Sequence, residues 1–146
     1  SVSPVSAGVV TVTASGGSLQ SRTIVSASTT SIADDAVGFT TAAGFKAYTL
    51  MKVGVSTAAW IRIYTDSTSR ANDSSRSVGE DPSPGSGVIA EVVTTGISTQ
   101  QMITPFAMGG NMDDPVSNVI YLAIKNLSGS TQTITANLTI LQLEAQ

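Results

Sequence analysis

The segment from Thr131 to Leu143 alternates apolar and polar residues one by one, and this period of two constrains the fold more than any other feature of the chain. Its interleaved apolar and polar series are Ile134, Ala136, Leu138, Ile140 and Thr133, Thr135, Asn137, Thr139. Successive side chains of a β-strand point to opposite faces, so the alternation predicts a strand with one buried face. The apolar phase then shifts to Leu141 and Leu143, which predicts a β-bulge near Ile140.

Further strands are expected where β-branched and aromatic residues gather between turn-forming residues. These segments cover residues 22–27, 45–55, 58–64, 88–95, 99–106 and 118–125. No stretch carries a 3.6-residue apolar period with helix-forming residues, and residues 126–130 read as a hairpin turn between the last two strands. We therefore expect an all-β fold: an antiparallel two-sheet β-sandwich, jelly-roll-like, with about eight strands and an extended N-terminal arm.

Two of these strands carry the candidate binding residues. In the segment 45–55 the expected inward side chains are Phe45, Ala47, Met51, Val53 and Val55, and the expected outward ones are Lys46, Tyr48 and Lys52. In the segment 58–64, Ile61 and Ile63 are expected to point inward, opposite the candidates Trp60, Arg62 and Tyr64.

Tyr48, Trp60, Arg62 and Tyr64 are candidates for partner or receptor binding, because Trp, Tyr and Arg are common interface anchors. On the strand 58–64 they would form a stacking platform for sugar rings or a contact for a protein. The alternative is that this face packs against the second sheet or against the long loop, since a buried amphipathic aromatic residue needs only one polar neighbour.

Residues 1–20 contain no charged side chain and only one short β-like run, residues 9–13. We expect an anchoring arm there, ordered by pairing with a sheet edge of the same chain or of a neighbour. The sandwich domain is expected over residues 21–146, with a polar surface loop at 65–87.

The chain has no His and no Cys. This composition excludes Ser-His-Asp and Cys-His nucleophiles, Cys/His zinc sites and thiol redox chemistry. The acidic pairs Asp34-Asp35, Glu80-Asp81 and Asp113-Asp114 match no EF-hand spacing and read as solvated loop residues instead of calcium ligands. Seven aromatic residues do not furnish the sugar-binding cleft of a glycosidase. We expect no enzymatic activity, no catalytic residue, no metal and no cofactor.

The formal net charge of −3 argues against nucleic acid as a partner, because phosphate binding needs clustered Lys and Arg. No run of 18 apolar residues occurs, so no membrane partner is expected. Only 12% of the residues are charged, against about 25% in typical domains. With 21 serines and 19 threonines, either hydroxyl groups keep the surface soluble or partners cover much of it.

Three segments, residues 58–64, 76–93 and 120–143, resemble a group of small β-sandwich proteins of tailed bacteriophages. The shared features are a turn of the Asp-Pro-x-Pro-Gly-x-Gly type, residues 81–87, and an Ala/Val/Thr-rich final hairpin. The resemblance covers about the last ninety residues. It implies a virion surface component such as a capsid-decorating, neck or tail-fibre protein, and it brings no catalytic residues.

The expected function is that of a non-enzymatic structural protein of a tailed-phage virion, which docks on major capsid, neck or tail proteins. Capsid cement or decoration is favoured over a fibre piece, because 146 residues leave no room for a long shaft. The low charge predicts a homo-oligomer, and the resemblance favours a trimer. The protein is expected to assemble in the host cytoplasm and to lie on the surface of the virion. The alternative is a carbohydrate- or receptor-binding module of a tail fibre, with a host-surface glycan as its partner.

Overall fold

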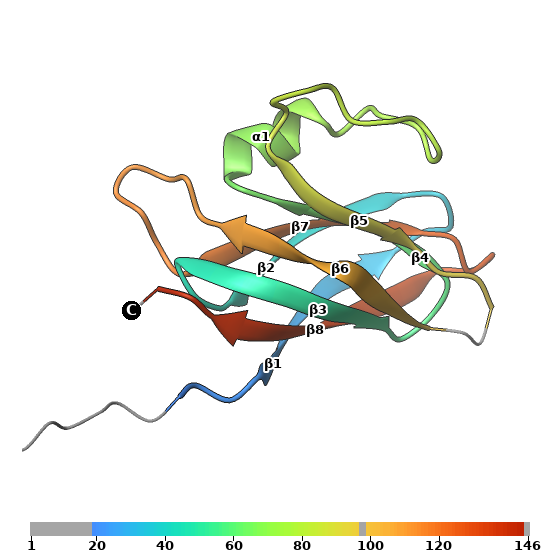
Figure 1. The fold of residues 1–146 in the computed structure, drawn as a ribbon. Helices are drawn as coiled ribbons and strands as arrows, with labels where there is room; N and C mark the ends of the chain where they lie inside the picture. The colour runs from blue at the N-terminus through green and yellow to red at the C-terminus, as the bar shows by residue number, and fades with distance from the viewer. Residues whose placement is uncertain (1–18, 97–98, 145–146) are drawn as a thin grey trace, which may run out of the picture.

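Two antiparallel sheets of four strands each pack face to face in the computed structural model, which describes residues 19–96 and 99–144 (Figure 1). The strands are β1 (Thr23–Ile32), β2 (Val37–Ala43), β3 (Ala47–Val55), β4 (Ala59–Tyr64), β5 (Val88–Val93), β6 (Gln100–Gly110), β7 (Val119–Asn126) and β8 (Gln132–Gln142). The all-β sandwich expected from the alternating segments is therefore confirmed. The predicted arm lies outside the described residues except for Leu19 and Gln20, which are exposed.

The strand order identifies the sandwich as a jelly roll. One sheet has the order β1-β8-β3-β6 and the other the order β2-β7-β4-β5. Consecutive strands cross from one sheet to the other, and among the described strands β4 and β5 alone are neighbours both in sequence and within a sheet. This pairing of distant strands is typical of the double Greek key.

The core between the sheets consists of alternating aliphatic side chains, as the period-two pattern predicts. From β8 it receives Ile134, Ala136, Leu138 and Ile140, all fully buried. Strand β4 is buried on both faces, since its outward residues are covered as well as its inward residues Ile61 and Ile63. A strand covered on both sides implies a further layer outside the sandwich.

That layer is the segment 65–87, which includes the short helix α1 (Ser67–Asn72) and lies over the outer face of the β2-β7-β4-β5 sheet (Figure 1). Asp66 caps the helix by accepting a hydrogen bond from the Ser69 amide at 2.7 Å. The segment is closed at its base, where the Thr65 amide donates to the Gly87 carbonyl at 2.9 Å. The sequence predicts a surface loop here and no helix.

Strand β3 departs from the predicted alternation. Against β8, the partners of Leu50 and Lys52 are the consecutive residues Ile140 and Thr139, so Met51 is an extra residue, or β-bulge. The bulge lies opposite Ile140, where a bulge is expected, but on the partner strand of β8. Before the bulge the even-numbered side chains point inward, so the expected outward orientation of Tyr48 is wrong.

Two further expectations are corrected. Strand β2 is not predicted by the sequence, because its inward residues Gly38 and Ala42 are too small to give a clear apolar series. Residues 126–130 do connect β7 to β8, but these strands belong to different sheets, so the connection joins the two layers instead of closing a final hairpin.

Candidate functional site

The outward side chains of β4 lie beneath the segment 65–87 and do not form an open platform. Trp60, Arg62 and Tyr64 are 1%, 0% and 1% exposed. Ile61 and Ile63 point into the core, and these three residues lie on the other face of β4. Both orientations agree with the sequence prediction. Of the two alternatives for this face, the structure has packing against the long loop, so none of the three side chains offers a binding surface.

Arg62 and Asp73 form the centre of a buried polar cluster. One guanidinium nitrogen of Arg62, Nη1, donates to the main-chain carbonyl of Asp73 at 2.8 Å and pairs with its Oδ2 at 3.3 Å. The Tyr64 hydroxyl donates to the same Oδ2 at 2.7 Å. Strand β4 thus holds the segment 65–87 through polar contacts to one carboxylate.

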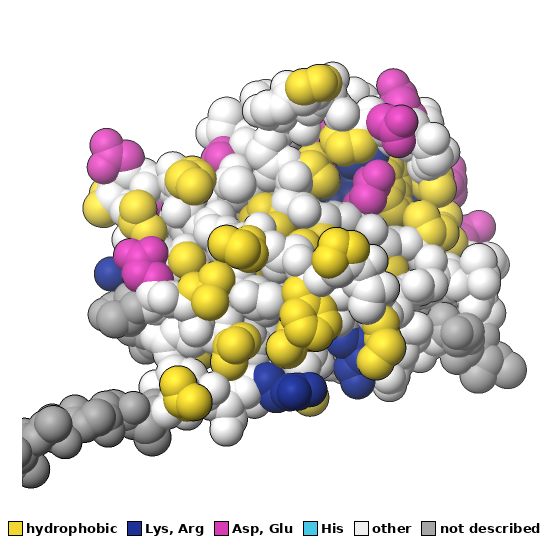
Figure 2. Space-filling view, in the orientation of Figure 1, with side chains coloured by type: hydrophobic (Ala, Val, Ile, Leu, Met, Phe, Trp, Pro, Cys, Tyr) yellow, Lys and Arg dark blue, Asp and Glu magenta, His cyan; other side chains and the backbone are white. Residues whose placement is uncertain are grey.

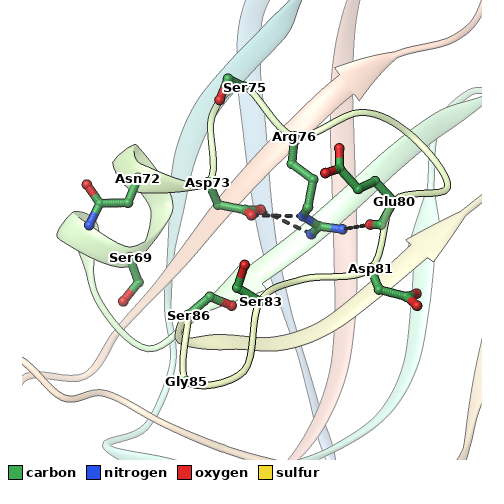
Figure 3. Close-up of a pocket in the computed structure, with 10 residues that line it drawn as sticks. All are labelled: Ser69, Asn72, Asp73, Ser75, Arg76, Glu80, Asp81, Ser83, Gly85 and Ser86. Carbon is green, nitrogen blue, oxygen red and sulfur yellow. Dashed lines mark hydrogen bonds and ion pairs between the residues drawn. The ribbon is translucent and has the colours of Figure 1, made fainter.

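Arg76 contacts Asp73 within the segment 65–87 (Figure 3) and also reaches Glu91 of β5. Its Nε donates to Asp73 Oδ1 at 2.8 Å, and its Nη2 pairs with Glu91 Oε2 at 2.8 Å. The guanidinium carbons of Arg62 and Arg76 lie 4.0 and 5.0 Å from the centre of the Trp60 ring. The indole nitrogen of Trp60 in turn donates to Glu91 at 3.2 Å. The two cations are therefore held by carboxylates and by an aromatic ring.

The ionisation of the cluster follows from these contacts. Burial tends to raise the pKa of Asp73, but hydrogen bonds from Arg76 and Tyr64 and the charges of Arg76 and Arg62 outweigh it, so the pKa is lowered. Burial and the hydrogen bond to Asp73 raise the pKa of the Tyr64 hydroxyl. Asp73 is therefore a carboxylate and Tyr64 a neutral donor at neutral pH, as a structural ion-pair cluster requires.

A polar depression of about 430 Å³ lies beside this cluster, within the segment 65–87 (Figure 3). Its lining consists of Ser69, Asn72, Asp73, Ser75, Arg76, Glu80, Asp81, Ser83, Gly85 and Ser86. This lining contains no aromatic side chain, and its only cation, Arg76, is already paired with carboxylates. The depression thus has neither a stacking surface nor an unpaired cation to offer a ligand.

Tyr48, the fourth candidate, is 1% exposed and lies in the core. Its ring packs on Gly109 of β6, where a Cβ atom in place of the glycine hydrogen would approach the Tyr48 ring to 2.6 Å. The Tyr48 hydroxyl is buried and has no hydrogen-bond partner among the described residues. Tyr48 is therefore a packing residue of the sandwich and not a surface contact.

The surface feature that the candidates do not anticipate is an exposed apolar area around β6. Met102, Phe106 and Met108 of this strand are 77%, 53% and 76% exposed, and Ile24 on β1 is 63% exposed. Cross-strand pairs place Ile24, Thr139, Lys52 and Met102 in one row across the β1-β8-β3-β6 sheet. Figure 2 shows hydrophobic side chains spread over this side of the molecule, with most acidic groups towards its margins.

Part of this area forms a groove of about 360 Å³, which we call the β6 groove. It is lined by Arg22, Thr23, Ile24, Met51, Lys52, Met102, Phe106 and Thr139. Arg22 and Lys52 form no ion pair with any described residue, and Lys52 makes one long hydrogen bond, to Gln100 at 3.4 Å. The β6 groove therefore combines apolar side chains with two positive charges that remain free to pair.

A signal for this surface is present in the sequence. Met102, Phe106 and Met108 are separated by even numbers of residues and alternate with Ile103 and Ala107, which pack against the core. A strand with apolar residues in both phases at a sheet edge is typical of a surface that is covered by something else. The sequence contains no such signal for the central place of Asp73 in the polar cluster. Its partners Arg62 and Tyr64 lie on β4, and local sequence patterns do not reveal contacts between separate elements.

The acidic pairs do not converge. Asp35 forms an ion pair with Lys125, and Asp113 accepts hydrogen bonds within its own loop and from β7. Within residues 19–96 and 99–144, no three His, Cys, Asp or Glu side chains gather as metal ligands would. In the same residues, no helix has the length and apolar character needed to cross a membrane.

Comparisons of the chain with protein-family models, with curated proteins and with solved structures found no match.

Proposed function

We propose that the chain is a non-enzymatic structural protein of a tailed-phage virion, an accessory surface protein that docks on other virion proteins. The observation that carries this proposal is the exposed apolar area around β6, with Met102, Phe106 and Met108 more than half exposed. The phage setting comes from the resemblance of residues 58–64, 76–93 and 120–143 to small virion proteins of tailed phages. Within that setting, capsid cement or decoration is favoured over a neck or fibre role.

The exposed apolar area around β6 is the surface that we assign to protein contacts. Soluble monomers rarely leave a large continuous apolar area uncovered, and such areas usually mark protein interaction sites. Methionine suits this use, because its unbranched side chain adapts to differently shaped partners. All four methionines of the chain lie on or beside β6: Met51, Met102, Met108 and Met112. We therefore assign an assembly role to this side of the sandwich.

Self-association follows from the same surface. A protein with 12% charged residues gains solubility by covering its apolar area with further copies of itself. We propose a closed homo-oligomer, with a trimer favoured by the resemblance. Attachment to the particle is assigned to residues 1–20.

The carbohydrate- or receptor-binding alternative has no comparable support. Its platform, Trp60, Arg62 and Tyr64, is buried under the segment 65–87, and no aromatic side chain lines the polar depression there.

The test uses particles of the phage that encodes the chain, freed of the protein and then incubated with labelled protein. We expect the full-length protein to sediment with the particles and to occupy regular positions on them in electron micrographs. The variant that lacks residues 1–20 is expected to stay in the supernatant. If the full-length protein also stays in the supernatant at micromolar concentration, the virion role is contradicted.

A further inference from the structure

The β6 groove presents an apolar floor with a positive rim. Ile24, Met102 and Phe106 supply exposed apolar surface, and Arg22 and Lys52 line the same groove without an ion pair among the described residues. An occupant that brings apolar side chains together with a carboxylate complements both the apolar floor and the two cations of the groove.

The occupant of the β6 groove does not pair with the free edge of β6 as a further β-strand. The register of β6 against β3 breaks between Met102 and Ala107, so residues 103–106 bulge out of the ladder. Pro105 lies in this bulge and has no amide hydrogen to donate. A bulge and a proline on an edge strand block the addition of another strand. The occupant of the groove must therefore bind through its side chains.

The connection between β6 and β7, residues 111–118, presents side chains of this kind. Met112 and Val116 are 70% and 47% exposed, and Asp114 between them is exposed and accepts no hydrogen bond from a described residue. We call Met112, Asp114 and Val116 the acidic tip. In Figure 1 this connection, coloured orange, protrudes beyond the end of the sheets.

The loop that carries the acidic tip is held in place from within. The side chain of Asn111, a residue only 4% exposed, accepts hydrogen bonds from the amides of Asp113 and Ser117 at 3.0 Å each. The carboxylate of Asp113 accepts from the Asn111 amide group and from the Tyr121 hydroxyl, both at 2.9 Å. Asp113 is thus engaged inside the loop, whereas Asp114 is left outside. An ordered loop loses little conformational entropy when its tip binds.

We propose that the acidic tip of one copy of the chain inserts into the β6 groove of the next copy. Met112 and Val116 then cover Ile24, Met102 and Phe106, and the Asp114 carboxylate lies between Arg22 and Lys52. This inference rests on the self-association proposed above and names the two surfaces that make it.

The groove and the tip are different surfaces of one chain, so a contact that uses one tip and one groove between two copies is head to tail. Head-to-tail contacts close into rings of three or more copies when the rotation between neighbours permits it. A two-fold dimer would have to place both tips in both grooves at once, and its mass would be twice that of one chain instead of three times or more.

The test is charge reversal on each surface, with association measured by light scattering and native mass spectrometry. Lys52→Glu places a carboxylate opposite Asp114, and Asp114→Lys places a cation opposite Arg22 and Lys52. Like charges across an interface weaken binding strongly, so each variant is expected to associate about a hundredfold more weakly than the wild type. Each variant alone should then be monomeric at concentrations where the wild type is assembled.

The double variant Lys52→Glu/Asp114→Lys is the decisive step. Each copy then carries a lysine on its tip and a carboxylate in its groove, so every contact of a closed ring, a ring of three included, has opposite charges again. We expect the double variant to associate more tightly than either single variant, and a double variant as weak as both of them would overturn the inference. The matched control is Asp81→Lys, an exposed acidic residue away from the tip, which should assemble like the wild type.

The other outcomes separate this inference from the proposed function. If the wild type is assembled and Asp114→Lys assembles equally well, the tip is not the occupant and the inference is overturned, while self-association stands. If Asp81→Lys dissociates the assembly and Asp114→Lys does not, the segment 65–87 fills the groove instead. If the wild type itself is monomeric, the proposed self-association fails together with the inference.

Discussion

Arg62 of β4 and Asp73 of the segment 65–87 are both buried, and Arg62 Nη1 contacts Asp73 twice, at its carbonyl oxygen and at its carboxylate. The pair joins the outer layer of the molecule to a sandwich strand where an apolar contact would be expected. Arg76 and Tyr64 contact the same carboxylate, so three side chains bind to Asp73.

The first prediction concerns the stability that this pair provides. Asp73→Asn removes the negative charge and leaves the buried guanidinium of Arg62 without a counter-ion. Breaking a buried pair in this way costs about 3 to 5 kcal/mol of unfolding free energy. Urea denaturation measures the loss. The matched control is Asp35→Asn, which removes the ion pair between the exposed Asp35 and Lys125 and is expected to change stability by about 1 kcal/mol or less. Equal effects of the two substitutions would contradict the structural role of Asp73.

The second prediction is the pH dependence of the same contribution. The folded-state pKa of Asp73 lies below its ordinary value of 3.8, so the unfolded chain takes up the proton first as the pH falls. The stability from Asp73 is therefore fully present above about pH 5 and is lost as the pH falls through the folded-state pKa. The difference in unfolding free energy between the wild type and Asp73→Asn should be constant from pH 7 to about pH 5 and should shrink below about pH 4. A difference that stays constant down to about pH 2 would show that the charge of Asp73 is not the cause.

The third prediction compares two buried tyrosines. The Tyr48 hydroxyl has no partner among the described residues, so Tyr48→Phe removes a desolvated polar group and should stabilise the protein by about 1 kcal/mol. The Tyr64 hydroxyl donates to Asp73, so Tyr64→Phe should destabilise it by about 1.5 to 3 kcal/mol. For a domain of this size, each kcal/mol moves the melting temperature by roughly 2 to 8 °C. Calorimetry should thus give shifts of opposite sign, and a fall in both melting temperatures would contradict the assignment for Tyr48.

These residues also show how far the sequence predicts the structure. Alternation and clusters of β-branched and aromatic residues locate seven of the eight strands. The alternation in β4 also predicts correctly that Ile61 and Ile63 face the core. The alternation predicts the wrong orientation for Tyr48. The extra residue Met51 reverses the order of inward and outward side chains within β3, and no local signal marks this bulge. The strand β2 is missed because Gly38 and Ala42 face the core with little apolar surface.

The candidate site is harder to predict than the fold. Whether Trp60 and Arg62 are exposed depends on the segment 65–87, whose closure is fixed by the non-local pair of Arg62 with Asp73. The spacing of Met102 and Phe106 marks a second apolar face of β6, but the position of this strand at the edge of its sheet follows from the strand order and not from local pattern.

The fourth prediction concerns residues 1–20. The first buried core residue in the described chain is Ala27, and β1 begins at Thr23. A chain that starts at Ser21 should therefore keep its fold, with a melting temperature within a few degrees of the full-length protein. Circular dichroism on the truncated protein checks this expectation. A truncated chain that fails to fold would assign a core strand to the removed residues and would move the predicted domain boundary.

If the exposed apolar area around β6 is an assembly surface, the mass of the wild-type protein in solution must exceed that of one chain. Light scattering at micromolar concentrations is expected to give a closed assembly, about three times the chain mass of 14.8 kDa. Met102→Asp, which places a charge on the apolar area, should reduce this mass to that of one chain without lowering the melting temperature of the monomer. A wild-type mass of one chain across the micromolar range would contradict the assembly role of this surface.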